Sequence, residues 1–335
     1  MEKPLVSVIM PYHKGDDFIL ESVLSVKNQT FKRFELIVVD DCSPGKPANE
    51  VLKSLEDQPW LRIVRHEVNS GLANARNTGV QLAHADYLLP LDCDDILKPE
   101  FLETCYQALQ ASKEYSAAFT QIEVFGAHEE IWSPSCEMTD IMSGNPVTST
   151  ILFKREICES IGGFRKGMRR SVDSDFWIRA LSKGWKVLRI EEPLFRYRKH
   201  PDSISVEDQL TEVTDLYSVN PELYREHIED VLKNFEKRYN KLKHEYMVLE
   251  AGFQEMEHGY HDLLKRYDDV VARLQERSIR YQLNKVFGGE ENPSCYSGTT
   301  YRSTQEIKEK CYKKPSKKRN EFEKPTTTRN YLPER

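Results

Sequence analysis

The chain has 335 residues, of which 39% are hydrophobic and 30% are charged, so it is long enough for one large domain with an appendage or for two domains. Its net charge of −6 gives no support for a nucleic-acid binder, and we expect no nucleic-acid partner. The seven cysteines include no C-x-x-C pair, which argues against a zinc cluster and against a disulfide framework.

Residues 1 to about 115 alternate between strand and helix patterns. Short apolar runs predict strands at 5–10, 34–39, 61–64 and 87–91. Helical periodicity predicts helices at 18–28, 51–55 and 72–82. Repeated β-α units indicate an α/β fold with a mostly parallel sheet flanked by helices. Ligands of such sheets bind outside the carboxyl ends of the strands, so we expect functional residues directly after the strands.

Polar residues follow the first two predicted strands. Pro11 and Tyr12 come after the first strand, and Asp40 and Asp41 come after the second. Carboxylates at these places can accept hydrogen bonds from a nucleobase and from ribose hydroxyls, and an aromatic ring nearby can stack on the base. Asp and Pro are also residues that favour turns, and the local sequence by itself favours that alternative.

A third cluster, Asn69 to Gly79, opens the helix predicted at 72–82. Small residues such as Gly71 allow the start of this helix to approach its surroundings closely. A helix N-terminus attracts phosphate, and Arg76 can reach an anionic group. A tightly packed amphipathic helix explains the same residues. The cluster contains no G-x-G-x-x-G, which disfavours a dinucleotide site.

Acidic residues end the strand predicted at 87–91. Side chains alternate along a strand, so Asp92 and Asp94 point the same way and repel each other unless a cation lies between them. Hard divalent ions such as Mg²⁺ and Mn²⁺ prefer oxygen ligands and often share them with substrate phosphates. The alternative is a group of acids that cap the helix predicted to begin near Lys98.

Together these clusters resemble the opening of a family-2 glycosyltransferase. The resemblance rests on motifs in the family's order and spacing: Ser7–Tyr12, Gln29–Phe31, Glu35–Ser43, Asn69–Gly79 and Leu91–Asp95. It covers about residues 4 to 205 and implies the Rossmann-like GT-A fold, a nucleotide-diphosphate sugar donor and Mn²⁺ or Mg²⁺ as cofactor. By this resemblance the donor-binding residues are Pro11, Tyr12, Asp40, Asp41, Asn69, Gly71, Arg76, Asp92 and Cys93.

The second half of the matched region is expected to supply the acceptor side. A β-rich run covers 147–153, and Ile161–Arg165 resembles the family's glycine-glycine-phenylalanine turn. Val172 stands where most relatives carry glutamate, and the next residue, Asp173, is the catalytic base by the resemblance. A carboxylate that opens an amphipathic helix can deprotonate a sugar hydroxyl as it attacks. Asp173 as a helix cap, or Asp175 as the base, are the alternatives.

The segment Phe195–Ser205 resembles the family's closing motif, in which the histidine often contacts the metal or the donor pyrophosphate. The resemblance therefore implies a metal site of Asp92, Asp94 and His200, although a lone histidine is more often structural or exposed. The implied chemistry is a single displacement with inversion at the anomeric carbon. The chain has no Gln-x-x-Arg-Trp sequence, which argues against a processive synthase of the cellulose type.

A heptad pattern begins at Ile228. Hydrophobic residues recur in alternating steps of four and three as far as Leu274, which predicts a coiled-coil seam about 70 Å long. We expect residues 206–287 to form a helical, coiled-coil oligomerisation region through 228–274, serving a homo-oligomer or another coil partner. A helical hairpin folded back on the catalytic domain is the alternative.

The charges beside the heptad bear on its orientation. In a parallel dimer Arg238 would face Lys243 and Glu245 would face Glu250, and both contacts join like charges. An antiparallel pair, a hetero-oligomer or a larger bundle is therefore at least as good an expectation.

The rest of the chain divides into two further regions. We expect a GT-A domain over 1–205 and a disordered tail over 288–335, which holds eleven Lys+Arg and seven Asp+Glu, a net of +4 (11 − 7). The sequence shows no signal peptide and no apolar run near the about 20 residues that a membrane helix needs. We expect a cytoplasmic protein with at most peripheral contact with the inner face of the membrane.

The first hypothesis is a non-processive, metal-dependent inverting glycosyltransferase of the hexosyl or N-acetylhexosaminyl class. It would move a sugar from a UDP-sugar to a hydroxyl of a glycan or lipid-linked glycan during surface polysaccharide synthesis. The alternative is a catalytically inactive GT-A scaffold that acts through its coiled coil. A sugar nucleotidyltransferase is disfavoured, since Met10–Gly15 lacks the glycine-rich basic loop that usually follows the first strand of that class.

Overall fold

The computed structural model describes residues 2–14, 17–44, 53, 58–144, 147–200 and 209–287. The chain divides into two compact units, Met1–Leu249 and Glu250–Arg335. The predicted tail lies outside the described residues, and so does the predicted helix at 51–55 except for Lys53. No helix of the described part is long and apolar enough to cross a membrane.

Four parallel strands form the first half of the sheet. Their order is β3, β2, β1 and β4, and their bounds are Leu61–Arg65, Phe34–Asp40, Val6–Tyr12 and Tyr87–Pro90. Pro11, Tyr12 and Asp40, predicted to follow the strands, are the last residues of β1 and β2. The register places Tyr12 beside Asp40, so these residues lie at one edge of the sheet. The predicted α/β fold is confirmed in this half.

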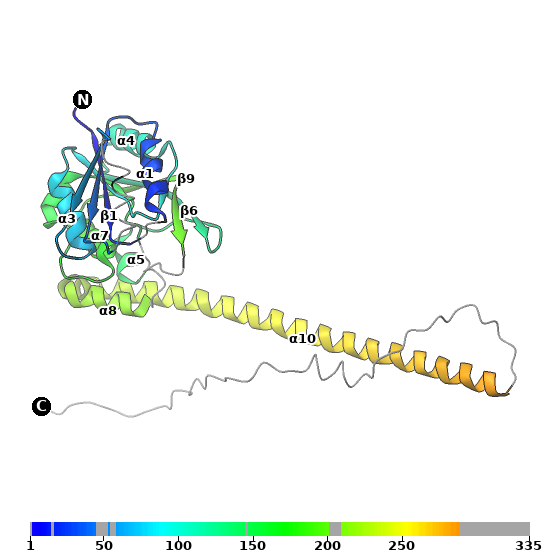
Figure 1. Ribbon diagram of the computed structural model, residues 1–335. Helices are drawn as coiled ribbons and strands as arrows, with labels where there is room; N and C mark the ends of the chain where they lie inside the picture. The colour runs from blue at the N-terminus through cyan, green and yellow to red at the C-terminus, as the bar shows by residue number, and fades with distance from the viewer. Residues whose placement is uncertain are drawn as a thin grey trace, which may run out of the picture. The chain divides into compact units, whose positions relative to one another are not determined.

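Two helices cover opposite faces of these strands (Figure 1). Helix α1, Ile19–Lys27, packs with Val8 and Met10 on one face, and α3, Leu72–Leu82, packs on the other face with Ile9. Successive strand residues point to opposite faces, so strands covered on both sides must be apolar throughout. This requirement explains the unbroken hydrophobic runs of the sequence.

The second half of the sheet mixes strand directions. It continues through β8, β6, β9 and β5, with β7 paired to β6; the bounds are Leu152–Lys154, Ala117–Gly126, Val187–Lys199, Ile96–Leu97 and Glu130–Trp132. The β6 and β9 strands are parallel, while β8 is antiparallel to both β4 and β6. The sheet as a whole is therefore a mixed sheet whose first half carries the parallel order.

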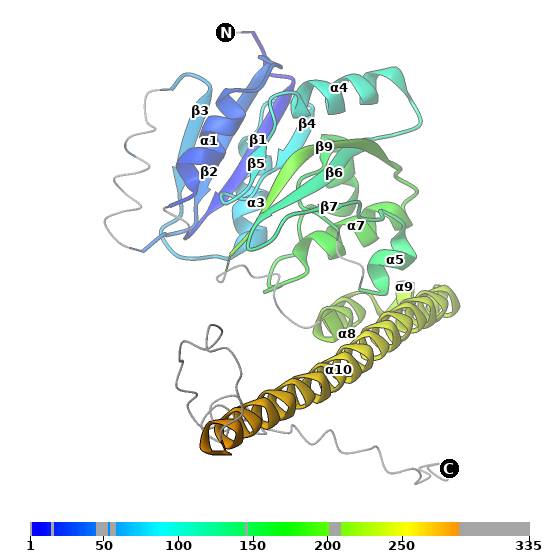
Figure 2. The ribbon, with the colours of Figure 1, turned by 90° about the vertical axis from the view of Figure 1, so that its right-hand side faces the viewer.

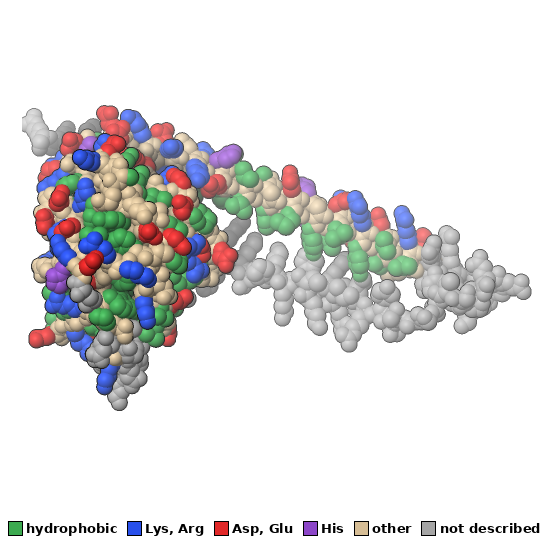
Figure 3. All heavy atoms as spheres, turned by 90° about the horizontal axis from the view of Figure 1, so that it is seen from above, with side chains coloured by type: hydrophobic (Ala, Val, Ile, Leu, Met, Phe, Trp, Pro, Cys, Tyr) green, Lys and Arg blue, Asp and Glu red, His purple; other side chains and the backbone are tan. Residues whose placement is uncertain are grey.

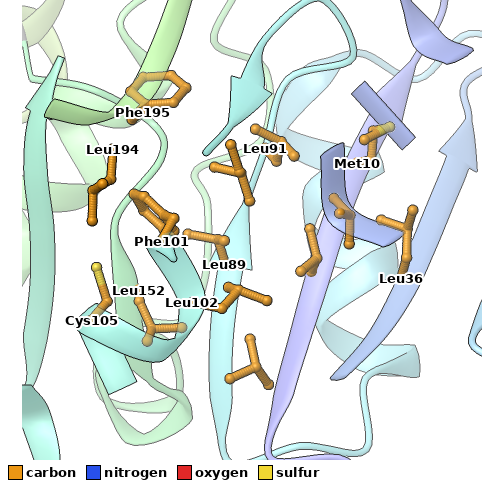
Figure 4. Close-up of a cluster of buried hydrophobic side chains, with 14 of the residues drawn as sticks. Met10, Leu36, Leu89, Leu91, Phe101, Leu102, Cys105, Leu152, Leu194 and Phe195 are labelled. Atoms are coloured by element: carbon orange, nitrogen blue, oxygen red, sulfur yellow. The ribbon is translucent and has the colours of Figure 1, made fainter. Parts of the chain in front are cut away.

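Helices enclose this half as well (Figure 2). Helix α4, Phe101–Ala111, packs on one face, where its Phe101 and Leu102 lie near Leu89 and Leu152 (Figure 4). Helices α5, α6 and α7 contribute to a second hydrophobic cluster, separate from the one that contains Phe101 and Leu102. These helices span Met138–Met142, Arg155–Ile161 and Val172–Ser182.

The run at 147–153 forms less strand than predicted. Strand β8 holds only its end, because the backbone turns at 148–151. Thr150 N–H donates to Thr148 Oγ1 at 3.1 Å, and Ile151 N–H donates to the Ser149 carbonyl at 2.9 Å. This turn leaves Ser149 close to the end of β4, where its hydroxyl contacts Asp92.

Three helices follow the sheet: α8 (Gln209–Val219), α9 (Pro221–Glu226) and α10 (Ile228–Phe287). Leu216, Tyr224 and Val231 are buried in the same hydrophobic cluster as α7. The Tyr224 hydroxyl also donates a 2.8 Å hydrogen bond to the Met142 carbonyl. The first turns of α10 therefore pack as part of the unit Met1–Leu249.

Candidate active site

Arg76 joins three segments that are far apart in the sequence. Its side chain is completely buried, and its Nη2 and Nη1 atoms donate to Asp92 Oδ1 at 2.8 Å and to Asp173 Oδ1 at 2.7 Å. Burial opposes the charge on arginine, but the two carboxylates outweigh it and raise the pKa of Arg76. The guanidinium thus fixes the end of β4 and the start of α7 against α3.

Close packing of α3 makes this geometry possible. An added Cβ at Gly79 would collide with Cγ2 of Ile9 on β1, so the helix lies nearer the sheet there than any other residue would allow. Ala75 is also fully buried. These small residues of the Asn69–Gly79 motif bring Arg76, on the same helix, to the carboxyl end of β4.

Asp173 lies in the first turn of α7 and keeps 24% of its side chain exposed. Burial has the largest effect on its pKa and raises it, Arg76 lowers it, and the charge of Asp92 adds to the rise, so that the pKa is about 6. A carboxylate with such a pKa is charged at neutral pH and still basic enough to accept a proton.

The alternatives for this helix do not fit its contacts. Asp175 is completely buried, and its carboxylate accepts hydrogen bonds from Arg165 Nε at 3.0 Å, Arg179 Nε at 2.8 Å and Asn220 Nδ2 at 2.9 Å. These bonds tie Asp175 into the packing around α7, and its side chain is not exposed. Asp173 does not cap α7, since the N-cap residue is Ser171 and no side chain caps it.

Asp94, the second acidic residue after β4, lies next to His200. Nε2 of the histidine is 3.1 Å from Asp94 Oδ2. Burial, and then the charge of Asp92, raise the pKa of Asp94. Burial and the same two aspartates raise the pKa of Asp95 well above its usual range. This group of acids holds excess negative charge that a cation would offset.

The acidic loop is held in place by strand β9. Arg198 N–H donates to Asp95 Oδ1 at 2.9 Å, and Arg198 Nε donates to the Asp94 carbonyl at 2.8 Å. The guanidinium also pairs with Glu21 at 2.6 Å. Asp95 and Arg198 therefore anchor the loop, a role that the sequence did not indicate for either of them.

The residues at the carboxyl ends of β1 and β2 form an internal network. Asp40 accepts hydrogen bonds from Ser43 N–H at 2.8 Å and from Arg65 Nε at 2.5 Å. Asp41 accepts from Ser70 N–H at 2.8 Å and Gly71 N–H at 2.7 Å. These bonds, together with His66, keep the pKa of Asp41 below its usual value although burial opposes them.

The remaining predicted donor residues surround this network. Tyr12 is 1% exposed and Pro11 is buried. The exposed Asn69 amide donates to His13 Nε2 at 2.9 Å. The Cys93 thiol donates to the Lys14 carbonyl at 3.3 Å, and burial raises its pKa well above the usual range.

Comparison with known proteins gives the family. The sequence profile described as Glycosyl transferase family 2 matches residues 7–177, which is half of the chain. The chain belongs to this family. It is a glycosyltransferase, as the resemblance predicted.

Relatives and solved structures agree with this assignment. An uncharacterized glycosyltransferase of Methanocaldococcus jannaschii is 30% identical over 59% of this chain and 72% of its own length. The Bacillus subtilis glycosyltransferase TuaG, provisionally assigned to teichuronic acid biosynthesis, is 32% identical over 61% of this chain and 82% of its own. A crystal structure of S. aureus TarS 1-349 with UDP has a TM-score of 0.52 at 19% identity, covering 64% of each chain. This likeness supports the predicted GT-A fold.

The structure brings together the predicted site residues Arg76, Asp92 and Asp173, and places Asp94 beside His200. Asp40 and Asp41 form hydrogen bonds within the chain, as the turn alternative predicts. Their contact with a nucleotide-sugar donor stays a prediction. Sequence reasoning missed His66 and Ser149. The sequence indicated Ser149 only through its place in the β-rich run at 147–153, which contains several β-branched residues and side chains with hydroxyl groups.

The acidic loop and His200 are the candidate ligands of a divalent cation. Within the described part of the chain, no three His, Cys, Asp or Glu side chains form a ready metal cluster. Both Asp92 oxygens accept hydrogen bonds, from Arg76 and from Ser149, and the Asp94 carboxylate lies beside the His200 imidazole. Two protein ligands fit a Mg²⁺-type ion, since such ions keep several waters and take substrate phosphates.

Proposed function

We propose that this glycosyltransferase moves a sugar from a nucleotide-diphosphate sugar to a hydroxyl of a glycan or lipid-linked glycan, with inversion and without a processive cycle. The observation that carries the proposal is the pair of hydrogen bonds from Arg76, which hold Asp173 beside Asp92 at the carboxyl end of β4. A base and an acidic, cation-attracting loop at one sheet edge are what a single displacement needs.

Asp173 is the proposed base. Its carboxylate, with a pKa of about 6, accepts the proton of the acceptor hydroxyl while the oxygen attacks the anomeric carbon. Arg76 keeps the carboxylate oriented and charged. Inversion follows from a direct displacement in which the acceptor oxygen attacks the anomeric carbon opposite the leaving diphosphate, and no covalent intermediate is needed.

The diphosphate end of the donor belongs to the acidic loop. Asp94 and His200 would hold Mn²⁺ or Mg²⁺, with Asp92 as a weaker candidate ligand. When bound, the ion supplies positive charge that stabilises the departing diphosphate. Ser149 and Arg76 hold Asp92 in place beside this position, and Arg198 fixes the loop through Asp95.

We propose UDP as the donor nucleotide, bound near Pro11, Tyr12, Asn69, Gly71 and Cys93. The support is the likeness in fold to TarS, which has been crystallised with UDP and with UDP-GlcNAc. The name of TuaG supports a role in making a surface polysaccharide. Tyr12 must leave its buried position if its ring is to stack on the base.

A panel of nucleotide sugars tests the function. Purified protein is incubated with each sugar and Mn²⁺, and released nucleotide is measured. We expect release from one UDP-sugar, its loss with a chelator, and its loss in Asp94→Asn. A folded protein that hydrolyses and binds no donor in the panel would support the inactive scaffold instead.

A further inference from the structure

One face of α10 is hydrophobic and exposed. From Leu242 to Leu274 every heptad residue is between 45% and 74% exposed, and hydrophobic side chains gather along one side of the helix (Figure 3). The beginning of the helix differs, since Val231 is buried and Phe235 packs against the core. A continuous apolar surface of this length marks an interaction site.

The two rows of this seam differ in size. Between Tyr246 and Val270 one heptad position holds only aromatic residues, at Tyr246, Phe253, Tyr260 and Tyr267, and Leu274 ends this row. The other position holds only aliphatic residues, at Leu249, Met256, Leu263 and Val270. In a parallel pair each row meets itself, so thick aromatic layers would alternate with thin aliphatic ones. In an antiparallel pair each aromatic residue meets an aliphatic one, so the layers between Tyr246 and Val270 have similar volume.

We propose that a second copy of this chain packs antiparallel on this seam, with the two-fold axis close to His258. In this register Tyr260 meets Met256 of the second copy, and Phe253 meets its Leu263. The overlap runs from Leu242 to Leu274 and leaves Phe235 to its contacts with the catalytic unit. The inference does not depend on the proposed transfer reaction.

Glycines support this register. Gly252 and Gly259 lie one heptad apart in the helix interior, where glycine is less stable than alanine. An added Cβ would meet no atom within 4 Å at either position, so packing within the described part of the chain does not explain them. In the proposed pair Gly259 lies opposite its own copy, where two helices can approach most closely if both lack a side chain.

Flanking charges distinguish the two orientations. Over Leu242–Leu274 a parallel pair joins Glu245 to Glu250, twice by symmetry, and gives no attractive contact between flanking positions. The antiparallel register joins Glu245 to Arg273 of the second copy, also twice. Its one like-charge contact is Glu257 with its own copy.

The buried area is sufficient for a stable dimer. Aromatic side chains bury roughly 150–250 Å² each, so the four aromatic residues of each helix would together remove on the order of 1,000 Å² from water. Stable interfaces bury about 1,200–2,000 Å², and the aliphatic row supplies the remainder.

Light scattering of the full chain tests whether a second copy binds to the seam. We expect twice the chain mass, and we expect Met256→Lys to give the monomer while His258→Lys, on the outer face, keeps the dimer. Circular dichroism should show the same helix content in both variants. A monomer or a larger assembly for the unaltered chain, or a dimer that Met256→Lys leaves intact, would overturn the proposal.

One charge reversal tests the orientation. In the antiparallel pair Glu245→Arg replaces attraction to Arg273 by repulsion, so the dimer Kd should rise about tenfold, and adding Arg273→Glu should restore it. In a parallel pair the same Glu245→Arg change would remove repulsion from Glu250. A fall in the Kd with Glu245→Arg alone would therefore contradict the antiparallel arrangement.

Discussion

His200 Nε2 lies 3.1 Å from Asp94 Oδ2, although the two residues are 106 positions apart in the sequence. Strand β5, which follows the acidic loop, pairs antiparallel with β9, which ends just before the histidine. Phe18 packs against the imidazole, with ring centroids 5.0 Å apart. The last strand of the domain thus completes the site that the fourth strand begins.

Replacing His200 should weaken metal activation. Loss of one metal ligand or its close neighbour typically costs about 10–100-fold in metal affinity, so His200→Ala should raise the Mn²⁺ concentration for half-maximal activity by that factor. Donor turnover measured across a Mn²⁺ titration checks this. The control is His128→Ala, because His128 is exposed and pairs with the nearby Glu130; equal titration curves for both variants would exclude the metal role.

Removing Arg76 should destabilise the fold as well as the site. Deleting one partner of a buried ion pair costs about 3–5 kcal/mol, and Arg76 is fully buried between two carboxylates. Arg76→Ala should therefore lower the free energy of unfolding by that amount in urea denaturation. Lys186→Ala is the control, since the ion pair of Lys186 with Glu114 is exposed. If both variants lower the free energy of unfolding by a similarly small amount, the ion pairs of Arg76 add little stability.

The pH dependence of transfer follows from the raised pKa of Asp173. The base must be unprotonated, and its pKa in the folded protein is about 6. At higher pH the carboxylate is charged, whereas below this value kcat/KM should fall tenfold for each pH unit. A pH profile of initial rates checks this, and an acid limb near pH 4, the range of an exposed aspartate, would contradict the proposed environment.

Gly79 should tolerate no side chain. Gly79→Ala places a methyl group against Ile9, and overpacking of this kind costs typically 1–3 kcal/mol. Urea denaturation measures the loss. Because the clash is with Cγ2 of Ile9, combining the change with Ile9→Ala should cost less than the sum of the two single changes. Strictly additive costs would mean that the helix moves away instead.

Local patterns predicted the elements that position the site. The helix at 72–82 and the strands before Asp40 and Asp92 occur where the apolar runs and periodicity predict them. Their polar ends lie at one sheet edge because parallel strands end together. The resemblance to the family added Asp173 and His200, which no local pattern separates from helix-capping or exposed residues.

Pairing between distant residues could not be predicted. Nothing near Arg76 indicates that its partners are Asp92 and Asp173, since that choice depends on how α7 packs against α3. Likewise the sequence around Asp40 and Asp41 is the same whether these residues bind a ligand or stabilise a turn. Only the contacts with Arg65 and Gly71 show that both carboxylates already have partners within the chain.

The central claim is that Asp173 takes the proton of the acceptor, and Asp173→Asn tests it most directly. Charge is removed with little change of shape, so kcat should fall by about 10²–10⁴ while donor binding by calorimetry stays within twofold. The matched change Asp175→Asn, in a residue held by two arginines, should lower stability and leave the rate per folded molecule nearly unaltered. Near-normal transfer by Asp173→Asn, with the loss of rate appearing in Asp175→Asn instead, would contradict the account.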